Sequence, residues 1–239
     1  MQSIVLEDIP FYIDLSEFSR ELCIKEGTSY SEDLGLLVRE AQRIGRPKAF
    51  YKLSFVEARE DFRVIIDGVV LTSRVLRANL EDVHRVFPYV ATCGEELEQW
   101  SNGIENALRR YWAEAIKEVA LSRAINFMKL DILERFRPGI VATMSPGSLR
   151  DWPIEEQRHL FSILGAARDM IGVHLSESLF MVPIKSVSGI CFPTEEDFSN
   201  CQLCPRKTCP GRKAPYDAAL WEKKYFTSET RHLKRKEAG

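Results

Sequence analysis

Four cysteines near the end of the chain could together bind one metal centre. They follow the spacing C-x9-C-x2-C-x4-C within nineteen residues. Thiolates are the soft ligands that iron–sulfur clusters and structural zinc both accept. We therefore predict a metal site whose ligands are Cys191, Cys201, Cys204 and Cys209.

A [4Fe–4S] cluster fits this spacing better than zinc. The spacing lacks the paired C-x2-C units of a zinc ribbon, and no histidine stands near the cysteines. It also differs from the C-x2-C-x2-C run of bacterial ferredoxins, so structural zinc and uncomplexed regulatory thiols stay open as alternatives. The other two cysteines, Cys23 and Cys93, are flanked by apolar segments, and we expect both to be buried as small hydrophobic residues.

Composition is that of a soluble globular protein with an ordinary core. Of 239 residues, 45% are hydrophobic and 28% are charged. No apolar run of about 18 residues could span a membrane, and the acidic N-terminus does not read as a signal peptide. We therefore expect a cytoplasmic location, where disulfide bonds between the clustered cysteines are disfavoured.

Charge is distributed unevenly along the chain. Residues 202–239 contain ten Lys/Arg and four Asp/Glu, which gives +6, and residues 1–201 carry −8. Basic groups beside the thiolates would stabilise their negative charge and could steer an acidic protein partner. Nucleic acid is a less suitable partner because no aromatic-interleaved basic face accompanies the tail. Phosphate-binding loops and hydrolase signatures are also missing, so ATP-driven activation and hydrolysis by this chain are not expected.

Hydrophobic periodicity predicts a mixed α+β domain that includes an antiparallel strand pair. Apolar residues at helical spacing, followed by glycine or proline stops, predict helices at 31–45, 73–86, 95–136 (as one helix or broken in two) and 154–165. Runs of β-forming residues predict strands at 49–57, 62–71, 88–94 and 184–192, with a tight turn at Asp67-Gly68. Between them, residues 144–153 are rich in turn formers, and Arg150, Asp151 and Trp152 there either line a cleft or form a solvated turn with one anchoring tryptophan.

Three segments together resemble the activation (reactivation) domain of cobalamin-dependent methionine synthase and its free-standing relatives. They are VFPYVATCGEELEQW (86–100), SPGSLRDWPIEEQRHLF (145–161) and LSESLFMVPIKSVSGICF (175–192). The resemblance implies that family's α+β fold, with a mixed or antiparallel sheet and long helices. Together with the cysteine spacing and the charge distribution, it divides the chain into four parts: an N-terminal extension (1–36), the activation-like domain (37–192), a four-cysteine metal-binding segment (191–215) and a basic tail (216–239).

In that family the domain binds S-adenosylmethionine through an Arg-x-Ala-x-Gly-Tyr motif. The corresponding stretch begins at Thr143 and includes the candidate cofactor-binding residues Ser145, Pro146, Gly147 and Ser148. Thr143 stands in place of the arginine and Ser148 in place of the tyrosine. A threonine cannot replace a bidentate guanidinium–carboxylate pair. The resemblance therefore supports the fold more than it supports S-adenosylmethionine binding.

The family domain docks over a corrinoid domain so that cob(II)alamin can be reduced and remethylated. Joined to a cluster that delivers single electrons, the resemblance implies an iron–sulfur protein that reductively activates a partner corrinoid protein or methyltransferase. Such a chain would be a corrinoid reductive activase or electron-transfer protein, supplied by an external electron donor. The alternative is a non-enzymatic module that binds or assembles the corrinoid protein and carries a zinc-stapled tail.

Overall fold

A computed structural model describes residues 2–195, 198–209 and 211–226. The main sheet contains β1 (Gln2–Leu6), β2 (Lys48–Glu60), β3 (Arg63–Ile66), β4 (Val69–Thr72), β5 (Arg85–Thr92), β6 (Val141–Met144) and β9 (Ser186–Pro193), and a separate hairpin contains β7 (His174–Leu175) and β8 (Met181–Val182). The α-helices are α1 (Leu15–Glu21), α2 (Ser29–Ile44), α3 (Arg74–Asn79), α4 (Glu95–Asn102), α5 (Ala107–Phe136), α6 (Gln157–Leu164), α7 (Ala167–Ile171) and α8 (Ala218–Leu220).

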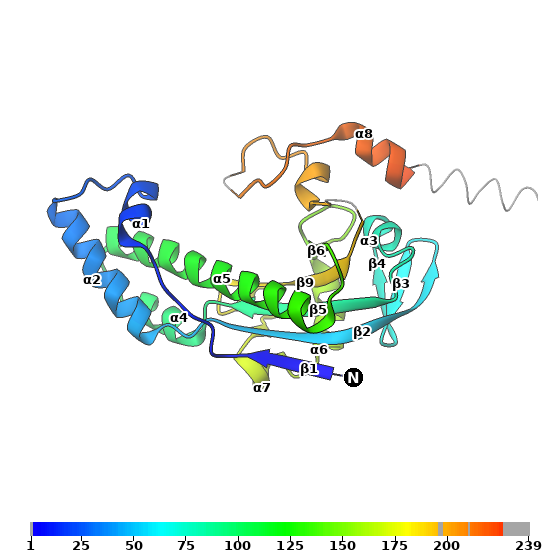
Figure 1. Cartoon of the computed structure of the whole chain (residues 1–239), viewed down its shortest axis with the longest axis horizontal. Coiled ribbons are helices and arrows are strands. Elements are labelled where there is room, and N and C mark those ends of the chain that lie inside the picture. The colour runs from blue at the N-terminus through cyan, green and yellow to red at the C-terminus, as the bar shows by residue number, and fades with distance from the viewer. Residues whose placement is uncertain (1, 196–197, 210, 227–239) are drawn as a thin grey trace, which may run out of the picture.

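The main sheet is antiparallel at every pairing. Its strand order is β4-β3-β2-β5-β9-β6, and β1 pairs with the first half of β2. The long helix α5 crosses the sheet (Figure 1). This is the α+β class, with an antiparallel sheet and long helices, that the sequence predicts.

Helices cover both faces of the sheet. In β9, Ile190 and Phe192 join a cluster that includes side chains of α6 and α7, whereas Cys191 joins a cluster under α5. Because successive side chains of a strand point to opposite faces, this alternation fixes which residues can meet. A third cluster joins α2, α4 and the first half of α5.

Two of the predicted elements have different bounds in the structure. The helix expected at 73–86 ends with α3 at Asn79, and β5 begins at Arg85. Val86 and Phe87 are fully buried in β5, which pairs with β2. These two apolar residues therefore belong to the sheet and not to the predicted helix. The expected strand at 62–71 is divided into β3 and β4 by the predicted Asp67-Gly68 turn, where φ is 49° and 77°.

The break that the sequence allows within residues 95–136 is present. Residues 95–136 form two helices, α4 and α5, separated at 103–106. Before residue 37, β1 pairs with β2, so this N-terminal segment contributes a strand to the sheet. Within the described ranges, no helix combines the length and apolar character needed to cross a membrane.

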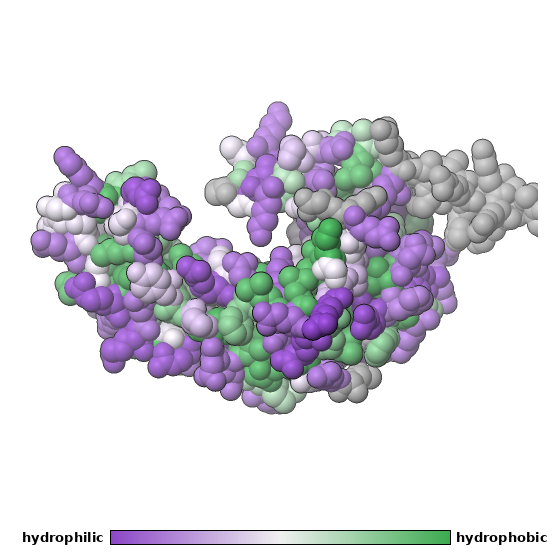
Figure 2. Space-filling model, viewed as in Figure 1, coloured by the Kyte–Doolittle hydropathy of each residue, from purple (hydrophilic) through white to green (hydrophobic). Residues whose placement is uncertain are grey.

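The C-terminal segment packs against the domain beside β6 and α3 (Figure 1). Phe198, Leu203 and Tyr225 are buried in the cluster on the α6 side, and the Tyr225 hydroxyl donates to Asn79 Oδ1 at 3.0 Å. The same view as a space-filling surface is hollowed over α5, between the N-terminal helices and this segment (Figure 2). The segment therefore forms one wall of a concave face.

Candidate functional site

The turn that follows β6 has the geometry that its sequence predicts. The Ser148 N–H donates to the Ser145 carbonyl at 3.2 Å, and Gly147 has φ +79°. Proline in second place and glycine with positive φ in third place are typical of a type II turn. A Cβ on Gly147 would lie 2.9 Å from Ile154 Cδ1, the end of a side chain that can shift, so the positive φ is the main reason for glycine here.

The residues after the turn are fixed to the start of α3. The Asp151 carboxylate accepts hydrogen bonds from Ser73 Oγ at 2.5 Å and from the Val75 N–H at 2.9 Å. The Trp152 side chain is fully buried. Of the two interpretations left open for this segment, an anchoring tryptophan is therefore present, and the turn is held rigidly in place.

Three of the four predicted metal ligands lie in one C-terminal loop. Cys201 belongs to a short 3-10 turn (Asn200–Leu203) that Ser199 and Gln202 stabilise through a capping box. Cys204 and Cys209 follow, and all three thiols are partly exposed. They are therefore accessible to a metal centre.

The Arg212 side chain ties this loop together, which could not be inferred from spacing. Its Nη1 donates to the carbonyls of Cys201 at 3.2 Å and Ala214 at 3.3 Å, and its Nη2 donates to the carbonyls of Cys204 at 3.5 Å and Arg206. Its backbone N–H donates to the Cys209 carbonyl at 3.2 Å. One residue thus contacts the backbone of all three loop cysteines.

The Cys201 thiol lies in a setting that favours its thiolate. The Lys213 N–H donates to Cys201 Sγ at 3.4 Å. This hydrogen bond is the main reason that the pKa of the thiol lies below its usual value, with burial opposing it and Ser199 and Arg212 assisting. Because metals bind the thiolate form, this setting suits a ligand.

Cys191 lies in a different setting. It sits in β9 between Phe87 of β5 and Thr143 of β6, and it is fully buried. Burial raises the pKa of its thiol to about 12, although the ammonium of Lys129 lowers it in part. Cys93 is equally buried and burial likewise raises its pKa to about 12, as expected for a buried hydrophobic residue, whereas the same expectation for Cys23 is wrong because Cys23 is exposed.

The structure does not gather the four thiols at one centre. Across residues 2–195, 198–209 and 211–226, no group of three or more Cys, His, Asp or Glu side chains is arranged to hold a metal ion. The loop thiols nevertheless fit a cluster by their chemistry, since they are accessible, have backbone N–H and basic groups nearby, and lie within nine residues. A four-thiol site stays a prediction.

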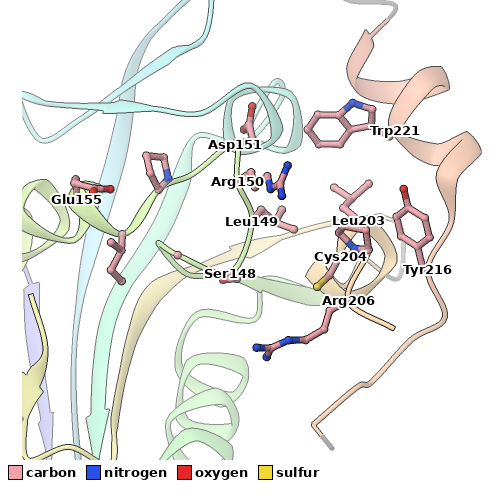
Figure 3. A pocket seen from close by; sticks show the side chains of 14 residues that line it. Ser148, Leu149, Arg150, Asp151, Glu155, Leu203, Cys204, Arg206, Tyr216 and Trp221 are labelled. Carbon is pink, nitrogen blue, oxygen red and sulfur yellow. The ribbon is translucent and has the colours of Figure 1, made fainter. Parts of the chain in front are cut away.

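One cavity joins the predicted turn to the cysteine loop. Its volume is about 850 Å³, and Gly147, Ser148 and Cys204 all line it (Figure 3). Asn200 Nδ2 also donates to Ser148 Oγ at 3.3 Å. Two sets of candidate residues far apart in the sequence therefore share one site, while Ser145 and Pro146 lie outside the cavity lining.

Sequence reasoning missed most of the other lining residues. Tyr216 and Trp221 provide aromatic surface, and Arg206 provides positive charge, together with Arg150 from the turn-rich segment (Figure 3). Arg150 and Asp151 both line this cavity, so the cleft interpretation of this segment holds together with the anchoring tryptophan. The prolines and basic residues beside the cysteines were the sequence signal that this loop could form a binding site. Their spacing does not show which part of the domain the loop packs against.

Comparisons with known proteins identify the fold. No protein-family model matches the sequence, and no curated protein sequence matches it. Among solved structures, the chain is similar to the MetH reactivation domain bound to AdoHcy, with a TM-score of 0.62 and 15% identity over 84% of this chain and 81% of that chain. The protein therefore has the α+β fold of the methionine synthase reactivation domain.

Proposed function

We propose that this chain is an iron–sulfur protein that reductively activates a partner corrinoid protein, from cob(II)alamin to cob(I)alamin, during methyl transfer. The ligands of a [4Fe–4S] cluster would come from Cys191, Cys201, Cys204 and Cys209. The observation that carries this proposal is the shared cavity, because it places a cysteine loop beside the turn of a reactivation-domain fold.

The loop residues would hold and tune such a cluster. A bound cluster would supply one electron at a time, at a potential set by hydrogen bonds to sulfur, nearby charge and exposure. Lys213 offers an N–H to the Cys201 sulfur, and Arg212 fixes the loop backbone around all three thiols. Because the thiols are partly exposed, electrons could enter from an external donor and leave towards a docked partner.

The hollow face over α5 supports the docking of a partner protein. Phe127 and Leu130 of α5 are large hydrophobic residues with 36% and 56% of their surface exposed. Exposed apolar surface of this kind is typical of interaction sites when it is contiguous. The concave face would receive the corrinoid domain, and the C-terminal segment forms its wall (Figure 2).

The proposal does not require S-adenosylmethionine. The Ser148 hydroxyl donates its one hydrogen to the Ser145 carbonyl and accepts from Asn200, so it has no hydrogen left to donate to a ligand. Thr143 pairs with Cys191 in the sheet and offers no guanidinium to a carboxylate ligand.

Anaerobic reconstitution tests the proposal directly. Incubated with iron, sulfide and a thiol reductant, the full chain should become brown, bind about four iron atoms and give an EPR signal on reduction. Mixed in its reduced form with a corrinoid methyl carrier held as cob(II)alamin, it should remove the cob(II) EPR signal. A colourless protein that binds one zinc per chain would contradict the proposal.

A zinc-stapled binding module is the second candidate, and the thiol chemistry would serve it equally well. The packing of the C-terminal segment favours the redox function, because buried Leu203 and Tyr225 already attach the segment to the domain. Cys204→Ser distinguishes the two. Loss of corrinoid reduction with an unchanged melting temperature supports the cluster, and unfolding of the segment supports the staple.

A further inference from the structure

The cavity between the turn and the cysteine loop has apolar walls from two distant segments. Leu149 comes from the turn-rich segment and Leu203 from the 3-10 turn before Cys204, and both line the cavity with only 7% and 5% of their surfaces exposed. Tyr216 and Trp221 add aromatic surface on one side (Figure 3). Tyr216 is 48% exposed, so much of its ring is left open. A flat apolar molecule fits against a surface of this kind.

Hydrogen bonds hold both walls of the cavity in place. On one side, the Asp151 carboxylate is bonded to the start of α3. On the other side, the Asp217 N–H donates to the Gln202 carbonyl at 2.8 Å and fixes the backbone of the aromatic wall. The bond from Asn200 to Ser148 joins the two sides. Because the walls are fixed before a ligand arrives, binding loses less conformational entropy.

Two arginines bring positive charge to the same cavity. Arg150 comes from the turn-rich segment and Arg206 from the cysteine loop, so each wall contributes one guanidinium (Figure 3). Both residues are exposed, and within the described ranges neither forms an ion pair. A guanidinium binds a carboxylate through two parallel hydrogen bonds and also stacks on aromatic rings. The lining therefore combines apolar surface with two cationic groups that are available to an anion.

Two acidic residues in the lining limit the charge of that anion. The Asp151 carboxylate already accepts two hydrogen bonds, and Glu155 lies at the opposite side of the view from Trp221 (Figure 3). Both side chains would repel a phosphate group that carries two negative charges. A single carboxylate is repelled less and still pairs with a guanidinium.

We propose that this cavity binds an aromatic monocarboxylate. The ring of the ligand lies against the apolar and aromatic walls, and its carboxylate pairs with the guanidinium of Arg150 or Arg206. A volume of about 850 Å³ accommodates such a molecule, and an apolar pocket with a few polar groups is the usual form of a small-molecule site. This inference goes beyond the proposed function and does not depend on it, because the cavity is lined by protein side chains alone.

Titration of the metal-free chain tests the ligand class. By isothermal calorimetry, 2-naphthoate should bind at one site per chain, and 2-naphthamide, which has the same ring without the charge, should bind at least about tenfold more weakly. A chain with both Arg150→Gln and Arg206→Gln should lose this preference for the acid. Arg39→Gln, at an equally exposed arginine of α2 that does not line the cavity, should keep it.

Three results of this titration would overturn the inference. Equal affinity for the acid and the amide would remove the anionic class, and the absence of binding by either would remove the cavity as a ligand site. Inorganic phosphate that binds more tightly than 2-naphthoate would replace the aromatic carboxylate with a phosphate ligand.

Alkylation of the loop thiols tests where the ligand lies. Cys204 lines the cavity, whereas Cys209 of the same loop does not. Saturating 2-naphthoate should slow the reaction of Cys204 with iodoacetamide severalfold and leave Cys209 unchanged, as measured by peptide mass spectrometry of the metal-free chain. Equal protection of both thiols, or of neither, would overturn this placement. None of these results depends on iron, so failure here leaves the proposed function standing, and failure to form a cluster leaves this inference standing.

Discussion

The guanidinium of Arg212 donates to the carbonyl oxygen of Cys201 at 3.2 Å, across eleven residues of chain. The same side chain reaches the carbonyls of Cys204 and Ala214. Since this loop has little regular secondary structure, these bonds replace the backbone ladder that would hold a helix or strand. Arg212 therefore helps to fix all three thiols, alongside the Ser199–Gln202 capping box at Cys201.

Replacing Arg212 should loosen the loop without unfolding the domain. In Arg212→Gln, backbone amides at 201–214 should exchange with deuterium roughly tenfold faster, because local opening then breaks fewer hydrogen bonds. Hydrogen-exchange mass spectrometry of the metal-free chain would measure this. Arg110→Gln is the matched control, since Arg110 also donates twice to a carbonyl, that of Ile104, far from the loop. Equal loop exchange in both variants would contradict the role of Arg212.

Removing the Asp151 carboxylate should release the turn from α3. Asp151→Ala leaves Ser73 Oγ and the Val75 N–H without their acceptor, so the free energy of unfolding should fall by about 1–3 kcal/mol. Asp151→Asn keeps one acceptor oxygen and should lose less. Urea unfolding followed by circular dichroism gives the comparison. Equal stability of the alanine variant and the unaltered chain would show that these bonds do not hold the turn.

A methyl group on Gly147 should be poorly tolerated. Gly147→Ala places a Cβ at a φ of +79° and against Ile154, so we expect a loss of about 1–2 kcal/mol in the free energy of unfolding. Gly211→Ala, where a Cβ meets no atom within 4 Å, is the control and should change stability little. The prediction fails if the two variants have the same urea midpoint.

The two buried thiols, Cys93 and Cys191, should make the free energy of unfolding fall at alkaline pH. Burial raises the pKa of Cys93 and Cys191 from 9.0 to about 12 in the folded chain. Their contribution is therefore complete below pH 9 and is lost as pH rises towards 12, because the unfolded chain ionises first. Each thiol should reduce the free energy of unfolding by about 1.4 kcal/mol per pH unit above pH 9.

Urea unfolding of the metal-free chain at pH 8, 9 and 10 in reductant would measure this slope. A Cys93→Ala/Cys191→Ala variant should show a shallower decline. Tyr89, whose pKa is raised to about 12 mainly by burial and to a smaller extent by Cys191, remains in both proteins. Cys201 has the opposite effect on stability, because its pKa is lowered in the folded chain. Its contribution to the free energy of unfolding is present above pH 9 and disappears as pH falls through its folded pKa. Parallel curves for the two proteins would contradict the assignment.

Local features of this protein follow from the sequence because they depend on neighbouring residues. The Pro146-Gly147 turn needs only a fixed proline φ and a glycine with positive φ, and Asp67-Gly68 divides β3 from β4 for a similar reason. The break between α4 and α5 is likewise local. The positions of these features were predicted to within a few residues. The α+β class was also predicted.

Tertiary structure alone decided how the site is assembled. The spacing of the cysteines suggests four equivalent ligands, but strand alternation turns Cys191 under α5 and leaves the other three on a loop. The cavity exists because Phe198, Leu203 and Tyr225 pack the C-terminal segment back beside a turn about fifty residues earlier in the chain. Such contacts arise from burial of apolar surface between distant segments, which no local spacing encodes.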